Sequence, residues 1–269
     1  MTEQPRRKKK RKKNPVNILI NIVLVIAILC FAGSGAYLFK YFYTNYKAEQ
    51  KVSELAEKIQ VTSETVVQTN EVGETEVLDG RYMELYNEND DFIGWVSIDG
   101  TTLNYPVMYT PEDNEYYLHR NFDKEYEYSG LPFVDARCSV NDPSQNIIIY
   151  GHYMKTDTMF SCIHNYKDPE YLKEHPTIQF DTIYESGEYE ICYVILSKAF
   201  YEGEEGFRYY DFIECADEAE FNETIAELEK LAIYDTGIDV TMDDQLITLS
   251  TCEYSQENGR MALIAKKIN

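Results

Sequence analysis

The longest apolar run of the chain spans residues 16–39, which contain no charged side chain and follow eight consecutive basic residues at 6–13. As a helix, this run extends about 36 Å, enough to cross a hydrocarbon core of roughly 30 Å. We therefore interpret residues 16–39 as a single transmembrane span. Because basic residues favour the cytoplasmic side, we expect the tail 1–15 inside the cell and the rest of the chain outside.

Two other interpretations of this apolar run were weighed. A cleaved signal peptide would use the small residues at 32–36, but its apolar region would then be at the upper limit of length for a signal. A buried helix of a soluble protein rarely runs this far without a polar stripe. The uncleaved membrane anchor is the interpretation that we favour.

The segment after the anchor changes character twice. Residues 40–60 are rich in charge and place Val52, Leu55 and Ile59 at helical spacing, which predicts a short amphipathic helix. Residues 61–80 combine acidic side chains with Thr, Ser, Val and Gly, a composition typical of a linker. We expect residues 40–80 to form an extracellular stalk and residues 81–269 to form one globular domain.

From residue 81 onward, short apolar runs alternate with turn residues, a pattern typical of β-strands. We expect strands at 92–98, 101–107, 131–135, 146–150, 177–182, 189–199, 245–251 and 261–268. Helices are predicted at 158–166, 168–174 and 217–231, the last with Phe221, Ile225 and Leu228 on one face. The fold class is therefore mainly β with added helices. Eight strands in this length predict a closed or nearly closed barrel, which leaves no exposed sheet edge.

Charge is distributed unevenly along the chain. The first thirteen residues carry +7 and the remainder carries −29, which together give the formal net charge of −22. Such an acidic body argues against nucleic acid as a partner, because phosphate contacts need Lys and Arg. The acidic residues do not show the spaced Asp/Asn loop of a calcium site, so we expect no metal and no cofactor.

The number of cysteines outside the predicted membrane span limits which of them can form disulfides. Cys30 lies in the predicted membrane span, which leaves Cys138, Cys162, Cys192, Cys215 and Cys252 outside it. Five is an odd number, so at least one of these thiols is unpaired within the chain. No CxxC pair is present, which argues against a zinc knuckle or a thioredoxin-type motif. A disulfide between two of the remaining four stays open.

Three predicted strand ends carry side chains that can take part in catalysis. His152 follows a glycine at the end of the run 146–150, Cys252 ends the run 246–251, and Arg260 opens the last strand. Each has an ordinary structural interpretation, respectively a loop hydrogen bond, a small buried side chain and an edge charge. Together the three side chains could serve one cysteine-based reaction. A thiolate forms more readily beside a cation, a histidine can move its proton, and an arginine can stabilise an oxyanion.

The segments IIIYGHYM, ITLSTC and GRMALIAK resemble the three signature blocks of sortases, the membrane-anchored cysteine transpeptidases of Gram-positive bacteria. Residues 93–107, 113–118, 159–160 and 168–176 resemble the class B members in particular, and the predicted helix 217–231 falls where that class carries one. The resemblance covers about residues 82–268. It implies an eight-stranded sortase-type β-barrel behind an N-terminal transmembrane helix.

The resemblance also implies a mechanism and its residues. Cys252 would attack the threonine carbonyl of a C-terminal sorting motif in a secreted protein, His152 would transfer protons, and Arg260 would steady the oxyanion. An amine of peptidoglycan or its lipid-linked precursor would then resolve the thioacyl-enzyme. The remaining residues assigned to the substrate groove are Asn114, Leu118, Ser250, Thr251 and, through its backbone N–H, Glu253. The other histidines, which match no block, are interpreted as surface or packing residues: His119, His164 and His175.

Three alternatives remain open at this stage. A pilus-assembling sortase would use a pilin lysine as its amine, with the same three side chains. A cysteine peptidase would let water resolve the acyl-enzyme. A non-catalytic surface-binding ectodomain would leave His152, Cys252 and Arg260 without a shared purpose, and it ranks last.

Overall fold

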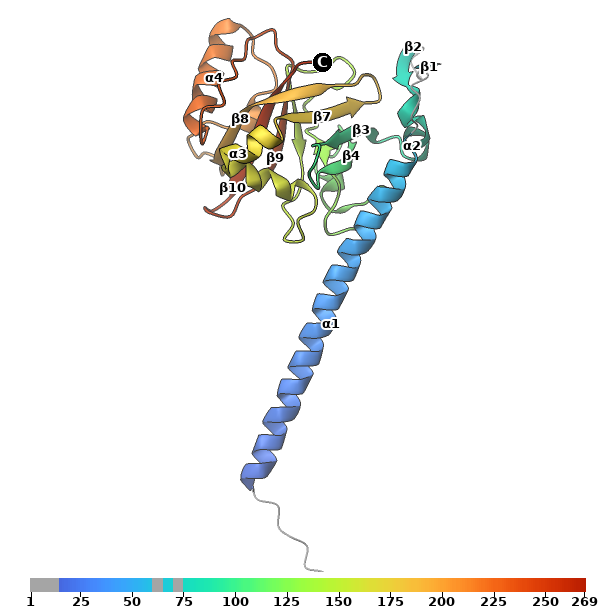
Figure 1. Ribbon diagram of the computed structural model, residues 1–269, viewed down its shortest axis with the longest axis vertical. Helices are drawn as coiled ribbons and strands as arrows, with labels where there is room; N and C mark the ends of the chain where they lie inside the picture. Colours follow the sequence, from blue (N-terminus) through green and yellow to red (C-terminus); the bar gives the residue numbers. More distant parts are fainter. Residues whose placement is uncertain (1–14, 60–64, 70–74) are drawn as a thin grey trace, which may run out of the picture. The chain divides into compact units, whose positions relative to one another are not determined.

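The computed structural model describes residues 15–59, 65–69 and 75–269, which fall into two compact units divided between Tyr46 and Lys47 (Figure 1). Helix α1 (Pro15–Glu57) has its residues up to Tyr46 in the first unit and the rest in the second. Its stretch from Leu19 onward is long and apolar enough to cross a membrane, although a signal sequence can have the same properties. The separate helix expected at 40–60 is therefore the continuation of α1. The basic tail lies outside the described residues, apart from Pro15.

The segment expected to be a linker is in part folded. Strands β1 (Thr65–Thr69) and β2 (Thr75–Asp79) pair antiparallel, and the 3₁₀-helix η1 (Gly80–Tyr82) and helix α2 (Met83–Glu88) follow. The N–H of Asp79 donates to the carbonyl of Ile183 at 2.7 Å, and Leu78 is buried. The β-branched residues of β1 and the buried Leu78 of β2 thus outweigh the linker-like composition here. Residues 60–64 and 70–74 of this segment lie outside the described part.

Eight strands close into a barrel, as expected. Their order is β10-β8-β7-β3-β4-β5-β6-β9, with β4–β5 and β6–β9 parallel and the other pairings antiparallel. The strands are β3 (Phe92–Ser97), β4 (Asn104–Met108), β5 (Phe133–Val134), β6 (Asn146–Tyr150), β7 (Thr177–Thr182), β8 (Glu188–Lys198), β9 (Leu246–Cys252) and β10 (Gly259–Lys267). The helical segments between them are η2 (Tyr116–His119), η3 (Phe160–Lys167), α3 (Pro169–Glu174), η4 (Tyr209–Asp211) and α4 (Glu218–Leu231).

Two helices begin where their capping residues predict. Asp168 precedes Pro169 and accepts a hydrogen bond from the N–H of Glu170, which starts α3. Asp217 accepts from two N–H groups of the first turn of α4. Both carboxylates satisfy donors that a helix start leaves free, so the boundaries are set locally.

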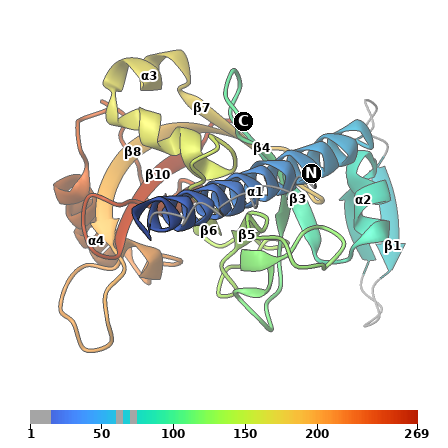
Figure 2. The same ribbon diagram turned by 90° about the horizontal axis from the view of Figure 1, so that it is seen from below.

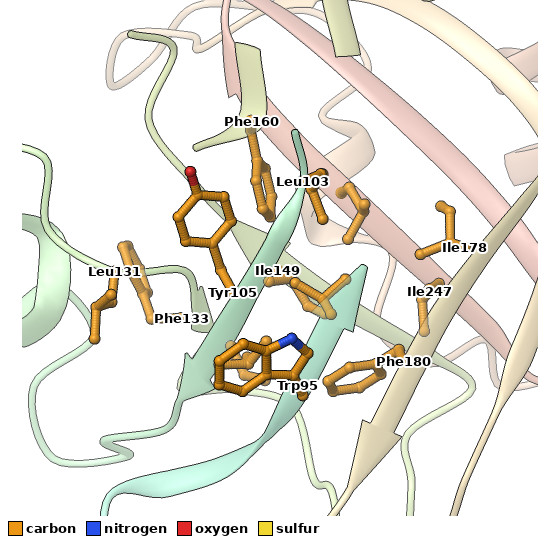
Figure 3. Close-up of a cluster of buried hydrophobic side chains, with 14 of the residues drawn as sticks. Trp95, Leu103, Tyr105, Leu131, Phe133, Ile149, Phe160, Ile178, Phe180 and Ile247 are labelled. Carbon is orange, nitrogen blue, oxygen red and sulfur yellow. The ribbon is translucent and has the colours of Figure 1, made fainter. Parts of the chain in front are cut away.

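Buried side chains form two clusters, because neighbouring residues of a strand face opposite sides of the sheet. The larger cluster includes Ile247 of β9 and fills the barrel, and Figure 3 shows part of it. The smaller cluster includes Leu246 of β9 and lies beneath α4, which contributes Phe221 and Leu228. Figure 2 shows α4 beside β8 and β10. Strand β9 is therefore covered on both faces, and only its C-terminal end opens toward the candidate site.

The barrel core supplies a stability prediction. Phe180 of β7 is 1% exposed and belongs to the cluster in Figure 3. Phe180→Ala should lower the free energy of unfolding by about 3–5 kcal/mol, because it leaves a cavity that the closed barrel fills only in part. Chemical denaturation of the full chain in detergent measures this. The neighbouring Gln179→Ala is the control and should change stability by less than about 0.5 kcal/mol. Equal effects of the two substitutions would contradict this description of the core.

Candidate active site

The strand order brings the three predicted chemical residues together. Strand β9 lies between β6 and β10, and Cys252 is its last residue. Arg260 of β10 is the direct pairing partner of Cys252. On the other side, Tyr150 of β6 pairs with Ser250, and His152 follows two residues later. The register therefore places the backbones of His152 and Arg260 level with Cys252, one on each side of β9.

Gly151 connects β6 to His152 in a tightly packed place. Its N–H donates to the carbonyl of Ser250 at 3.1 Å, which extends the pairing with β9 by one residue. A Cβ at this position would lie 2.6 Å from the ring of Phe160. The glycine is therefore required by the close approach of an aromatic ring rather than by an unusual backbone turn.

His152 has a defined tautomer. Its Nε2 lies 2.9 Å from the carbonyl oxygen of Leu118, and a carbonyl can only accept, so we assign the hydrogen to Nε2. Nδ1 of the neutral ring is then the nitrogen that can take a proton. Burial lowers the pKa of His152 below 6.5, against the hydrogen bond to Leu118, which raises it. The neutral ring is therefore favoured at neutral pH.

Arg260 carries a charge that no carboxylate neutralises. Its Nη1 donates to the carbonyls of Gly259 at 3.0 Å and Asn258 at 3.3 Å. Within the described residues, no Asp or Glu forms an ion pair with it. Two carbonyls orient the guanidinium without cancelling its charge, which leaves that charge for a thiolate or an oxyanion.

The expected groove residues next to the cysteine do not offer their side chains to a groove. Ser250 and Thr251 are 1% and 2% exposed. The Ser250 hydroxyl pairs with the hydroxyl of Tyr209 at 2.7 Å, whereas the Thr251 hydroxyl shares the barrel-interior face of β9 and has no hydrogen-bond partner. Consecutive strand residues point to opposite faces, so the two could not have lined one groove together.

The backbone N–H of Glu253 is engaged rather than free. It donates to the carbonyl of Gly259 at 2.9 Å, which corrects the expectation that it would be available to an oxyanion. The carboxylate binds Lys167 at 2.7 Å and the N–H of Ser255 at 2.8 Å. Burial alone would raise the pKa of Glu253, but these contacts outweigh it and lower the pKa from 4.5 to about 2. Glu253 therefore holds the segment that follows Cys252.

The two more distant groove residues have clear structural contacts. Asn114 Oδ1 accepts a hydrogen bond from the N–H of Ala136 at 2.7 Å, on an exposed part of the surface. Leu118 is half-buried and holds His152 through its carbonyl. The contribution of Leu118 that the structure shows is thus made by its backbone.

Two histidines that were interpreted as packing residues lie at the site. The ring of His119 stacks on that of His152, with centroids 5.2 Å apart. Nε2 of His164 lies 2.9 Å from the carbonyl oxygen of Cys252, and its ring stacks on Tyr153 at 4.2 Å. No motif or spacing in the sequence signals these contacts, because they join loops that are distant along the chain.

All six cysteines are free, which settles the open disulfide question for this structure. Burial raises the pKa of Cys138 and Cys192 to about 12 and that of Cys162 to about 11. These three thiols are therefore poor nucleophiles near neutral pH. Outside the apolar helix, only Cys215 and Cys252 are partly exposed.

Comparison with known proteins places this barrel and its cysteine in a family. No family model matches the chain. It is 34% identical over 187 residues to sortase B of Listeria monocytogenes, covering 69% of this chain and 73% of that protein. It is 27% identical over 252 residues to sortase B of Staphylococcus aureus, covering 93% and 96%. A solved Staphylococcus aureus sortase B–substrate complex matches with a TM-score of 0.67 and 26% identity, covering 86% and 97%.

The fold and these relatives define a cysteine transpeptidase. The chain belongs to the class B sortases, as the sequence resemblance predicted.

The environment of His152 predicts its titration. In an NMR pH titration of the full chain, the His152 ring, assigned by loss of its signal in His152→Gln, should titrate below pH 6.5, because burial disfavours the imidazolium. The charge of His119 acts in the same direction, so His119→Phe should move the His152 pKa upward while keeping an aromatic ring in the stack. A pKa at or above 6.5 in the unmodified chain would contradict the assignment.

Proposed function

We propose that Cys252 is the nucleophile of a transpeptidation reaction in which His152 moves protons and Arg260 stabilises the oxyanion. The observation that carries this proposal is the register that pairs Cys252 with Arg260 and brings His152 beside them from β6. The uncompensated charge of Arg260 favours the thiolate. The hydrogen bond from Nε2 of His152 to the Leu118 carbonyl leaves Nδ1 of the neutral ring as the nitrogen that can accept the thiol proton.

The chemistry then follows in two halves. The Cys252 sulfur attacks the carbonyl carbon of a threonine, and the negative oxygen of the tetrahedral intermediate is held by the Arg260 guanidinium. The C–N bond breaks, and the leaving amine takes a proton from His152. In the second half an amine attacks the thioester, His152 accepts its proton, and the thiol is released as a new amide forms.

We propose that the acyl donor is a secreted protein with a C-terminal sorting motif and that the acceptor is an amine of peptidoglycan or its lipid-linked precursor. In this proposal residues 1–15 are cytoplasmic, residues 16–39 cross the membrane once, and the barrel is extracellular. The apolar part of α1 and the basic residues before it support this orientation. We propose that residues 40–80 connect the membrane to the catalytic domain 81–269, with Lys47–Glu57 of α1 already in the compact unit of the barrel.

Removal of the nucleophile is the first test. Cys252→Ala should abolish both the thioacyl-enzyme and the transpeptidation product, measured by mass spectrometry of the full chain incubated with a sorting peptide. The matched control is Cys215→Ala, which removes the other partly exposed thiol outside the apolar helix and should leave both signals unchanged. Turnover by the Cys252 variant would exclude it as the nucleophile.

Arg260 provides a second test. Arg260→Ala should lower kcat by about 10²–10³-fold, the usual cost of losing an oxyanion donor. Arg208→Ala removes a guanidinium that instead lies over the ring of Phe200, and it should leave kcat unchanged. Steady-state cleavage of a fluorogenic sorting peptide measures both variants. A change in KM alone after Arg260→Ala would indicate substrate binding rather than oxyanion stabilisation.

The acceptor is identified by competition. The full chain is incubated with a panel of sorting peptides and two competing acceptors, a peptidoglycan-type amine and a pilin-type lysine peptide. The products are identified by mass spectrometry. We expect ligation to the wall-type amine. Exclusive ligation to the lysine peptide would indicate pilus assembly, and release of free acid alone would indicate a peptidase.

A further inference from the structure

The short helix η3 forms contacts with His152, with Cys252 and with the residue that follows Cys252. At its start, the N–H of Phe160 donates to the carbonyl of His152 at 3.0 Å. In its middle, His164 Nε2 lies 2.9 Å from the carbonyl oxygen of Cys252. At its end, Lys167 forms an ion pair with Glu253 at 2.7 Å. One rigid segment thus contacts the general base, the nucleophile and the residue after the nucleophile.

The helix η3 is itself firmly held. Phe160, Ile163 and Tyr166 are fully buried beneath it. The preceding Met159 has φ 56°, a conformation unfavourable for a residue with a side chain, and its N–H donates to the Tyr105 hydroxyl at 2.9 Å. Such a backbone persists only where the surroundings over-determine it. The helix can therefore act as a fixed support rather than as a mobile loop.

The contact between His164 and Cys252 has a defined chemical direction. The Cys252 carbonyl can only accept, so Nε2 of His164 carries the hydrogen and donates it. Burial lowers the pKa of His164, so its ring is neutral at neutral pH. The side chain thus supplies one N–H to the backbone of the nucleophile and adds no second charge beside Arg260.

The ion pair between Lys167 and Glu253 holds the residue directly after Cys252. The Glu253 carboxylate is 5% exposed and is held by Lys167 from η3 and by Ser255 from its own turn. The Lys167 side chain is 41% exposed, so only the Glu253 end of the pair is buried. Removal of Lys167 would leave this buried carboxylate without its charged partner, which favours displacement of the segment that carries it. Displacement of this segment would move Cys252, because Glu253 is its direct chain neighbour.

We propose that η3 is a brace that sets the position of the nucleophile, with His164 and Lys167 as positioning residues for Cys252. The inference rests on the proposed function of Cys252. A misplacement of about 1 Å can cost a reaction up to about 10²-fold in rate, so a brace that holds both His152 and Cys252 affects kcat without contacting substrate.

The decisive experiment separates the N–H donor of His164 from its ring. His164→Phe keeps a ring to stack on Tyr153 but removes the donor, whereas His164→Gln loses the ring and places an N–H at the position of Nε2. In peptide cleavage by the full chain, His164→Phe should lower kcat about tenfold with KM and Tm little changed, and His164→Gln should restore kcat to within about twofold. Equal loss in both variants, or loss in neither, would overturn the brace.

The ion pair gives an independent second pair of variants, which decides the matter if His164→Phe does not fold. Lys167→Met should lower kcat about tenfold, and Lys167→Arg should restore it. The matched control is Lys173→Met, which removes an exposed ion pair with Glu170 on α3 and should leave kcat unchanged. A Lys167→Met variant with unaltered kcat would contradict the role of the ion pair.

A measurement that needs no substrate separates the test of the brace from the test of the proposed function. The rate at which iodoacetamide alkylates Cys252, located by mass spectrometry, should fall at least about threefold in His164→Phe and recover in His164→Gln. If the unmodified chain forms no thioacyl adduct with any peptide, the proposed function is wrong. If it does form the adduct but alkylation and kcat do not follow the His164 donor, the brace is wrong.

Discussion

The pairing of β9 with its two neighbours is the constraint on which the active site depends. A slip of one residue would turn Cys252 from the outward face into the barrel. Two buried polar contacts on the outward face oppose such a slip. The Thr248 hydroxyl donates to Asn146 Oδ1 at 2.9 Å, and the Ser250 hydroxyl pairs with Tyr209. A slip would leave these groups without partners, at about 1–3 kcal/mol for each.

The parallel pairing of β6 with β9 has a topological consequence. Parallel neighbours need a long connection, and here it carries η3, α3, β7, β8, η4 and α4 between His152 and Cys252. The two residues that exchange protons in the proposed reaction therefore stand at opposite ends of that connection. The site is complete only when the barrel has closed, and η3, near the start of the connection, returns to contact its end.

The sequence predicted the elements better than the contacts between them. The bounds of β6 and β7 agree with the strands expected at 146–150 and 177–182, because apolar runs and turn residues are local signals. The helices expected from residues 168 and 217 begin one residue later, because the side chains of Asp168 and Asp217 cap them through equally local hydrogen bonds. By contrast, the pairing of β1 with β2 was not predicted, because the acidic composition of residues 61–80 is typical of a linker.

Some residues of the candidate site could likewise be predicted from the sequence and others could not. Cys252, His152 and Arg260 could be found because each stands at a strand end in a recognisable block. The contacts of Glu253 and His164 could not, since the N–H of Glu253 binds a carbonyl six residues later and the ring of His164 binds the Cys252 carbonyl 88 residues later. Side-chain type says little about such backbone contacts, which are determined by the closed barrel.

The charges next to Cys252 differ from the average charge of this strongly acidic chain. With 47 acidic and 25 basic residues, the average surface opposes a negative sulfur. The carboxylate nearest to the thiol along the chain is that of Glu253, which is buried and forms an ion pair with the more exposed Lys167. Arg260, in contrast, is oriented by carbonyls and keeps its charge. The charged groups next to Cys252 along the sheet are therefore one neutralised carboxylate and one guanidinium that forms no ion pair within the described residues, and charges in a partly buried site are screened less than at the surface.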